Sequence, residues 1–148
     1  MEVKTIEECL KFRLLRNIAP SVEKSKKSLE LSKRNLEDAV YFMKENKDAL
    51  FKFTITSSYM AMFHAARAVL YKDGIQEKSH YAVFIYLKEK YSSIVSLSVI
   101  NLLNIHRTER HEAMYGLEYK PNREDAKEAV KDAKIFIKEM EGIIGKKR

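Results

Sequence analysis

One stretch of this sequence constrains the fold more than any other: residues 54–71 (TITSSYMAMFHAARAVLY), where Arg67 alone carries a full charge. Small residues alternate with bulky ones throughout, and a helix that is apolar on nearly every side is typical of the buried centre of a bundle. Eighteen residues also just reach the length of a transmembrane helix. However, the serines, His64 and Arg67 argue against lipid, because an arginine within a membrane is expensive and rare. We therefore predict a buried central helix and no membrane segment.

The rest of the chain is predicted to be helical because it contains few residues suited to turns. Among 148 residues there are four glycines and two prolines, and 33% of the residues are charged, which is typical of a helix-rich globular protein. The spacing of the apolar residues predicts further helices over residues 5–17, 22–44, 80–91, 95–115 and 123–144. No stretch shows the alternation of a strand, and no segment repeats.

Capping residues predict where these helices begin and end. Ser21, Asp48, Ser79 and Asn122 are suitable N-caps, because their side-chain oxygens can accept a hydrogen bond from a free N–H of the first turn. Gly74 suits the left-handed position that follows the central helix. The short connections favour antiparallel neighbours, so the central helix should form a hairpin with the helix before it.

These elements predict an all-α fold, an up-and-down helical bundle of four to five main helices. We expect a single domain over residues 1–148, with an N-terminal helix in 1–19, the bundle in 21–144 and a short basic tail at 145–148.

Composition gives an expectation for the cellular compartment and for the classes of binding partner. The single cysteine, Cys9, excludes an intrachain disulfide, and the N-terminus lacks the pattern of a signal peptide, so we expect a cytoplasmic protein. The net charge of +7 permits binding to nucleic acid or another polyanion. Many lysines are interleaved with glutamates, however, as on an ordinary solvated helix face. Charge alone therefore does not specify the partner.

Three sequence blocks stand in the order SSYMAMFHAARAVLYKDGI, EKSHYAVFIYLKEKY and RHEAMYGLEY, ahead of a last amphipathic segment. Together they resemble the HEPN domain family (higher eukaryotes and prokaryotes nucleotide-binding). The first block is specific because of its length and unusual composition, and the resemblance covers roughly residues 21–140. Residues at matching positions include Tyr59, His64, Arg67, Ser79, His80, Arg110, Tyr115 and Gly116.

The resemblance implies a bundle of four or five helices that usually forms a homodimer. Many members of the family are ribonucleases in which an arginine is followed four to six residues later by a histidine, near the dimer axis, so that two copies face one cleft. Some members pair with a small nucleotidyltransferase as toxin and antitoxin, and others bind nucleotide or RNA without known turnover. RNA or a nucleotide, a second copy and a nucleotidyltransferase are thus the implied partners.

The chain departs from the catalytic pattern of that family. Alignment through the AMYG segment puts Arg110 at the arginine position, and no histidine follows it four to six residues later. Arg107 and His111 do have the shortest allowed spacing. Met114 stands where the family usually has an aspartate before the tyrosine. We therefore favour binding over turnover.

The fifth predicted helix carries the candidate chemistry. Metal-independent RNA cleavage needs a group that transfers a proton, which histidine can do near neutral pH, and a cation for the developing phosphorane charge, which arginine supplies. Arg107 and His111 share one helix face, and His106 and Arg110 form a second pair rotated by roughly 100°. Across a two-fold axis these pairs would line a cleft, and Tyr115 could donate to a phosphate or stack on a base.

A purely structural interpretation remains open for each of these residues. The Arg/His pairs could form the solvated end of an amphipathic helix, with Glu109 and Glu112 partly neutralising them. His64 and Arg67, one turn apart in the central helix, are expected mainly to make interhelical hydrogen bonds, because buried polar groups need partners. His80 is expected to cap or anchor the fourth helix.

We predict no metal and no cofactor. His106 and His111 are five residues apart, about 140° around a helix, and no carboxylate–histidine motif or glycine-rich phosphate loop is present. The leading hypothesis is an RNA- or nucleotide-binding module, as half of a toxin–antitoxin pair with a small nucleotidyltransferase. The alternatives are a metal-independent endoribonuclease and a non-catalytic protein-interaction bundle. Candidate binding residues are His64, Arg67, His106, Arg110 and Tyr115, and candidate catalytic residues are Arg107, Arg110, His111 and Tyr115.

Overall fold

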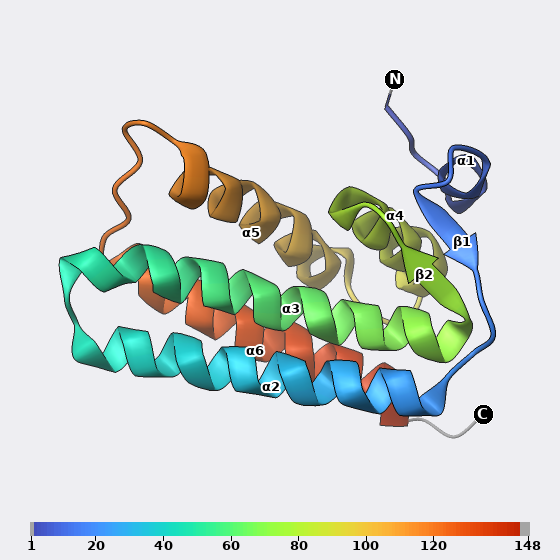
Figure 1. The fold of residues 1–148 in the computed structure, drawn as a ribbon, viewed down its shortest axis with the longest axis horizontal. Helices are drawn as coiled ribbons and strands as arrows, with labels where there is room; N and C mark the ends of the chain where they lie inside the picture. The colour runs from blue at the N-terminus through green and yellow to red at the C-terminus, as the bar shows by residue number, and fades with distance from the viewer. Residues whose placement is uncertain (1, 146–148) are drawn as a thin grey trace.

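Three long helices, α2 (Val22–Glu45), α3 (Phe51–Asp73) and α6 (Arg123–Gly145), form the body of the molecule (Figure 1). The structure is a computed structural model that describes residues 2–145. Its shorter elements are α1 (Ile6–Lys11), β1 (Leu15–Asn17), the 3₁₀ turn η1 (Asp48–Leu50), β2 (Ile75–Glu77), α4 (His80–Tyr91) and α5 (Leu97–Tyr115). The predicted all-α class is confirmed, with two short strands added to the bundle.

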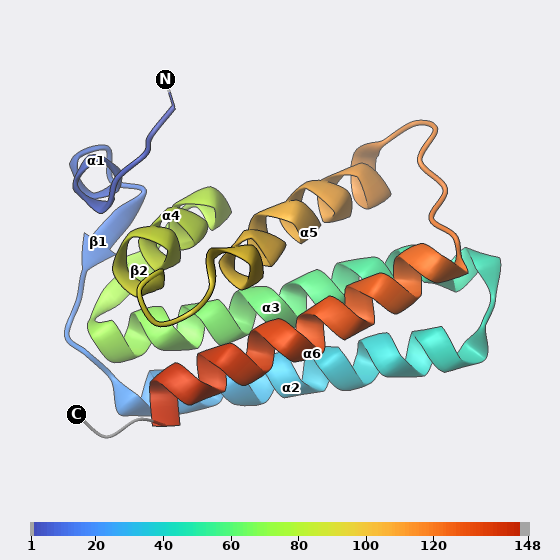
Figure 2. The ribbon, with the colours of Figure 1, turned by 180° about the vertical axis from the view of Figure 1, so that it is seen from behind.

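The apolar stretch 54–71 lies within α3, the central helix. α3 runs between α2 on one side and the α4–α5 pair on the other, and α6 packs against it from behind (Figures 1 and 2). Tyr59, Met62 and Leu70 of α3 are 0% exposed. Full burial of such side chains stabilises the fold by about 1.5–3 kcal/mol each, so the unusual composition of this stretch has the predicted cause.

In the hairpin of α2 and α3, serine side chains cap the start of α2 and form hydrogen bonds between the two helices. α2 starts at its predicted N-cap, since the Ser21 hydroxyl accepts a hydrogen bond from Lys24 N at 3.1 Å. Ser28 Oγ donates to the His64 carbonyl oxygen at 2.8 Å, and Ser32 donates in the same way to α3. Asp48 does not cap α3 as predicted, because it begins η1 and α3 starts three residues later.

The other predicted caps are present. Ser79 Oγ accepts from Ala82 N at 3.3 Å at the start of α4. Asn122 and Asp125 bond each other's backbone N–H at 2.9 and 2.8 Å at the start of α6. Gly74 ends α3 in the left-handed region with φ of 83°, and an added Cβ would lie 2.7 Å from the Ile18 carbonyl oxygen. Glycine is therefore required there by both backbone conformation and space.

The first predicted helix is wrong beyond Lys11. The chain turns through Arg13, whose φ is 60°, and continues as β1, which pairs antiparallel with β2. Leu15 lies opposite Glu77 in this two-stranded sheet and is 1% exposed. Strands of three residues are too short to show a period of two, and their pairing partner lies far along the chain. The prediction that the chain contains no strand fails for this reason.

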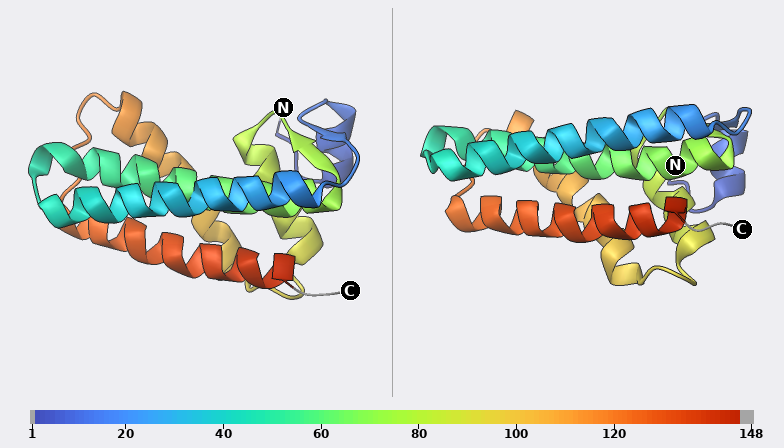
Figure 3. Two further views of the ribbon diagram at one scale, coloured as in Figure 1. Left: turned by 60° about the horizontal axis from the view of Figure 1, so that its bottom comes forward. Right: turned by 90° about the horizontal axis from the view of Figure 1, so that it is seen from below.

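The helices α2, α3 and α6 run side by side and α5 crosses them obliquely, whereas α1 and α4 lie at the end where the β-strands pair (Figures 1 and 3). Val22, the first residue of α2, is 81% exposed. Within residues 2–145, no helix has both the length and the hydropathy needed to cross a membrane. The predicted basic tail, beyond Gly145, lies outside the described residues.

Candidate functional site

His80, the first residue of α4, lies at the centre of a cluster built from α3, α4 and α5. Its ring stacks on Phe63 of α3, with ring centroids 3.9 Å apart and an angle of 11° between the planes. Its Nδ1 lies 2.8 Å from the Tyr59 hydroxyl oxygen, one turn earlier on α3. Two contacts from α3 thus fix both the plane and the orientation of the imidazole. We refer to Tyr59, Phe63, His64, His80, Arg107 and Arg110 as the His80 cluster.

Two arginines of α5 reach this cluster. The Arg110 guanidinium lies over the Tyr59 ring, 5.9 Å from its centroid, and the Arg107 guanidinium lies over the Tyr81 ring at 5.3 Å. Arg107 Nε also donates to Asn104 Oδ1 at 2.9 Å. Within residues 2–145, neither guanidinium forms an ion pair with a carboxylate. Their positive charge is therefore available to an anion.

His64 and Arg67 of α3 border the same cluster. His64 is 8% exposed and its Nδ1 has no hydrogen-bond partner, although its ring touches Phe63 with centroids 5.5 Å apart. Arg67 Nε lies 3.1 Å from Glu77 Oε1, which makes an ion pair without the alignment of a hydrogen bond. The expected interhelical hydrogen bond of the His64 ring is thus absent at Nδ1. A buried polar atom without a partner calls for an explanation such as a ligand or water.

The cluster keeps its imidazoles neutral. Burial, with the charges of Arg67 and His80, lowers the pKa of His64 to about 4. Burial, with the charges of Arg110, Arg107 and Arg67, also lowers the pKa of His80. Burial raises the pKa of Tyr59, so its hydroxyl stays protonated and can either donate to His80 Nδ1 or accept from it, depending on the tautomer of His80. Near neutral pH the site therefore combines neutral imidazoles with three guanidinium groups, an environment suited to a phosphate.

His106 lies elsewhere, in the interface between α5 and α6. It is 3% exposed, with Nε2 2.8 Å from Asp132 Oδ2 and Nδ1 3.1 Å from Glu109 Oε1. Burial opposes its charge, but the hydrogen bonds and charges of the two carboxylates outweigh burial and raise its pKa. Glu109 in turn accepts from the Tyr119 hydroxyl at 3.0 Å. His106, one of the predicted binding residues, therefore links α5 to α6 in the interior. It does not form a surface pair with Arg110.

His111 and Tyr115 occupy the exposed end of α5. Their ring centroids are 5.0 Å apart, and Tyr115 is 65% exposed. The predicted pair of Arg107 and His111 therefore has its two members in different surroundings, one against Tyr81 and one against Tyr115. Within residues 2–145, the ring contact of His111 is with Tyr115 and not with a ring of the His80 cluster.

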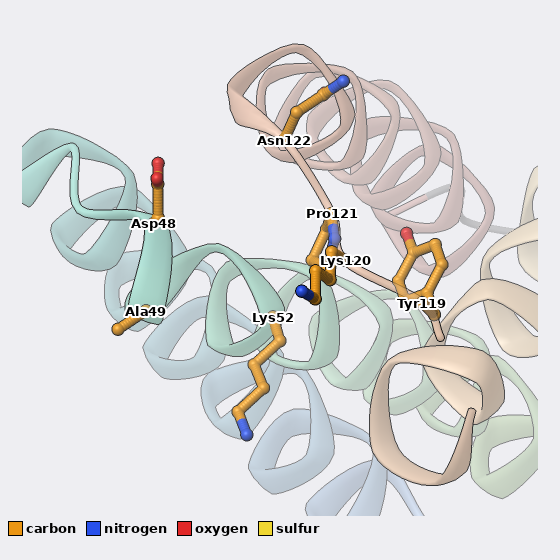
Figure 4. A pocket seen from close by; sticks show the side chains of 7 residues that line it. All are labelled: Asp48, Ala49, Lys52, Tyr119, Lys120, Pro121 and Asn122. Carbon is orange, nitrogen blue, oxygen red and sulfur yellow. The ribbon is translucent and has the colours of Figure 1, made fainter. Parts of the chain in front are cut away.

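A separate open pocket of about 490 Å³ lies where η1 meets the segment before α6 (Figure 4). Its lining side chains are Asp48, Ala49, Lys52, Tyr119, Lys120, Pro121 and Asn122. Its lining includes no histidine or arginine, so His64 and His80, whose pKa values are lowered, lie outside this pocket. In the part of the chain that the structure describes, no group of three or more metal-ligating side chains is gathered.

Sequence reasoning placed Arg107, Arg110, His64 and Arg67 among the candidates but assigned His80 only a capping role. Tyr59 and His80 are 21 residues apart and meet because residues 75–79 run back along α3 before α4 begins. Further along α4, Tyr86 and Tyr91 donate to Asp73 at the end of α3. The sequence did hint at a shared role for Tyr59 and His80, because both belong to the blocks on which the family resemblance rests. Periodicity could not reveal that the two blocks converge.

Two comparisons with known proteins agree with this architecture. The family model described as HEPN domain matches residues 22–143, which contain all of the His80 cluster. The chain therefore belongs to the HEPN domain family. It is also similar to a protein of Archaeoglobus fulgidus described as a UPF0332 protein, with 32% identity over 123 residues that cover 81% of this chain and 98% of the relative.

Proposed function

We propose that this protein is an RNA- or nucleotide-binding module whose phosphate-binding site is the His80 cluster. The observation that supports this most strongly is the convergence of Arg67, Arg107 and Arg110 around two neutral imidazoles, with Glu77 as the single carboxylate that forms an ion pair with them in residues 2–145. Arginine is well suited to phosphate because its planar donors match the oxygen geometry. Phosphate contacts of this kind supply most of the affinity for nucleic acid.

We further propose that the site functions in a homodimer that meets at the exposed end of α5. Met114, Tyr115 and Leu117 are 50%, 65% and 101% exposed, an unusual density of bare apolar side chains beside a candidate site. A two-fold axis there would bring His111 and Tyr115 from both copies toward the two clusters. This arrangement gives the two exposed aromatic rings a role that one chain does not provide.

A second candidate function is a metal-independent endoribonuclease. His80 supports it: in the tautomer whose Nδ1–H donates to the Tyr59 hydroxyl oxygen, Nε2 is unprotonated and can accept the proton of a ribose 2′-hydroxyl. Arg107 and Arg110 would stabilise the developing phosphorane charge. His111, from the same or the other copy, would then protonate the leaving oxygen. A nucleotidyltransferase partner, as in a toxin–antitoxin pair, is compatible with either function and would bind over the same cationic face.

The test is to measure binding and cleavage of end-labelled single-stranded RNA in EDTA at low salt. We expect Arg110→Ala to weaken binding about tenfold or more, because a charged hydrogen bond to phosphate is lost. The matched control is Arg123→Ala, which removes an exposed arginine from the start of α6. If wild type cleaves and His80→Ala does not, the endoribonuclease is favoured. Absence of any RNA or nucleotide affinity at low salt would refute both candidates.

A further inference from the structure

A second cationic surface lies on the opposite flank of α3, in a groove between α2 and α3. The groove has a volume of about 340 Å³, and three cations of α2, Lys24, Lys27 and Arg34, line it together with Arg67 of α3. Tyr71 forms part of its floor. We call this the basic groove. Its lining includes no carboxylate among the described residues, in contrast to the interleaved charges elsewhere on α2.

Arg67 is paired with Glu77, whereas Lys24 and Arg34 form no ion pair with a carboxylate within residues 2–145. Tyr71 is 8% exposed, and two cations lie over its ring, Lys24 at 5.7 Å and Arg67 at 5.1 Å from the centroid. Lys27 forms an ion pair with Glu23 at 3.1 Å, but both side chains are more than 70% exposed, and such a pair is weak. The positive end of the α2 dipole, beside Lys24, adds to the same potential.

Arg67 joins the groove to the His80 cluster. It lines the groove, and its charge also acts on the buried imidazole of His80. On α2, Lys24 and Arg34 are ten residues apart, which corresponds to about 15 Å of helix axis. A single phosphate or mononucleotide cannot span that distance and also reach His80. A polymer with regularly spaced phosphates can.

We propose that the backbone of a single-stranded RNA runs from the His80 cluster past Arg67 into the basic groove, where Lys24, Lys27 and Arg34 contact successive phosphates. This inference rests on the proposed function, since it extends the same ligand beyond the first site. It assigns affinity for longer RNA to the groove and recognition of the terminal or reacting phosphate to the cluster. The contacts are ionic and therefore independent of base sequence.

The test compares oligoribonucleotides of about 4 and about 16 nucleotides, the range of site sizes on proteins that bind single strands. The groove variant is Lys24→Ala/Arg34→Ala. Its control is Lys26→Ala/Lys44→Ala, which removes two exposed charges from other positions of the same helix. Thermal unfolding followed by circular dichroism confirms that each variant folds.

We expect wild type to bind the longer RNA more tightly than the shorter one. The groove variant should lose that gain while still binding the short RNA like the control. Its slope of log affinity against log salt for the longer RNA should fall by about 1.4, about 0.7 for each lost contact.

Two results would overturn the proposal for the groove. One is that the groove variant and its control bind the long RNA equally, with Arg110→Ala still impaired, which leaves the His80 cluster standing. The other is that wild type binds both lengths with equal affinity. Loss of long-RNA binding in the groove variant, with no effect of Arg110→Ala, would instead support the groove and refute the proposed cluster.

Discussion

His106 of α5 and Asp132 of α6 form a buried hydrogen bond, with 2.8 Å between Nε2 and Oδ2 and less than a tenth of either residue exposed. Because Glu109 binds the other ring nitrogen and Tyr119 donates to Glu109, one network ties α5, α6 and the segment between them. The helix that carries Arg107 and Arg110 is therefore positioned in part by buried hydrogen bonds to α6.

Removing Asp132 should destabilise the protein strongly. Asp132→Ala leaves the buried imidazole of His106 with one carboxylate instead of two, and a buried donor left without its partner costs about 1–3 kcal/mol. The free energy of unfolding from urea denaturation measures the effect. Asp38→Ala, at an exposed position of α2, serves as control and should change that free energy by less than about 0.5 kcal/mol. Equal values for the two variants would show that the network contributes no stability.

The same network should make stability depend on pH. The pKa of His106 is raised in the folded state above the unfolded value of about 6.5. Its contribution is therefore fully present below about pH 6.5 and is lost as the pH rises through the folded pKa. We expect the stability difference between wild type and His106→Gln to be largest in acid and to shrink on the alkaline side. A difference that stays constant across this range would contradict the charged form of His106.

His64 should act in the opposite direction. Its pKa is lowered from 6.5 to about 4 in the folded state, so its contribution is present above about pH 6.5 and is lost as the pH falls toward 4. The shift corresponds to roughly 3 kcal/mol at the acid end. Relative to His64→Gln, wild type should lose stability over this window, as measured by denaturant unfolding at each pH. Parallel curves for the two proteins would show that His64 is protonated at its ordinary pKa.

The proposed dimer predicts that a charge at the end of α5 will separate the two copies. Leu117 has no buried surface in one chain, so Leu117→Glu should leave the monomer fold intact while placing two like charges at the proposed axis. Light scattering after gel filtration should show a dimer for wild type and a monomer for the variant. Tyr41→Glu, at a 61% exposed aromatic residue on α2, should remain dimeric. If wild type is itself a monomer, the axis at α5 is ruled out.

The parts of the fold that depend on local pattern were predictable, and the parts that depend on convergence were not. The composition of residues 54–71 predicts a buried helix, Ser79 and Asn122 predict where helices start, and Gly74 predicts where one ends. Each of these effects acts within a few residues of the chain. The pairing of β1 with β2 and the contact of Tyr59 with His80 join segments that only the folded chain brings together.

The candidate site shows the same division. The arginines of α5 could be singled out from their spacing, but which side each faces depends on its neighbours from other helices. His106 and Arg110 are one turn apart, yet Asp132 holds the first in the α6 interface and Tyr59 lies under the second. A helical wheel places both on one face and cannot distinguish an internal clamp from a ligand contact.

Residues 6–18, which include one strand of the short sheet, form hydrogen bonds both to the turn before α4 and to a residue near the end of α4. Leu14 O accepts from Lys78 N at 2.9 Å, Ile18 N donates to Gly74 O at 2.9 Å, and Ile6 N donates to Glu89 Oε1 at 3.2 Å. All three bonds brace α4 and the turn that precedes His80 from a segment that the family match, 22–143, does not include. The position of the His80 ring therefore depends partly on hydrogen bonds from residues 6–18, which lie outside the segment that the family model matches.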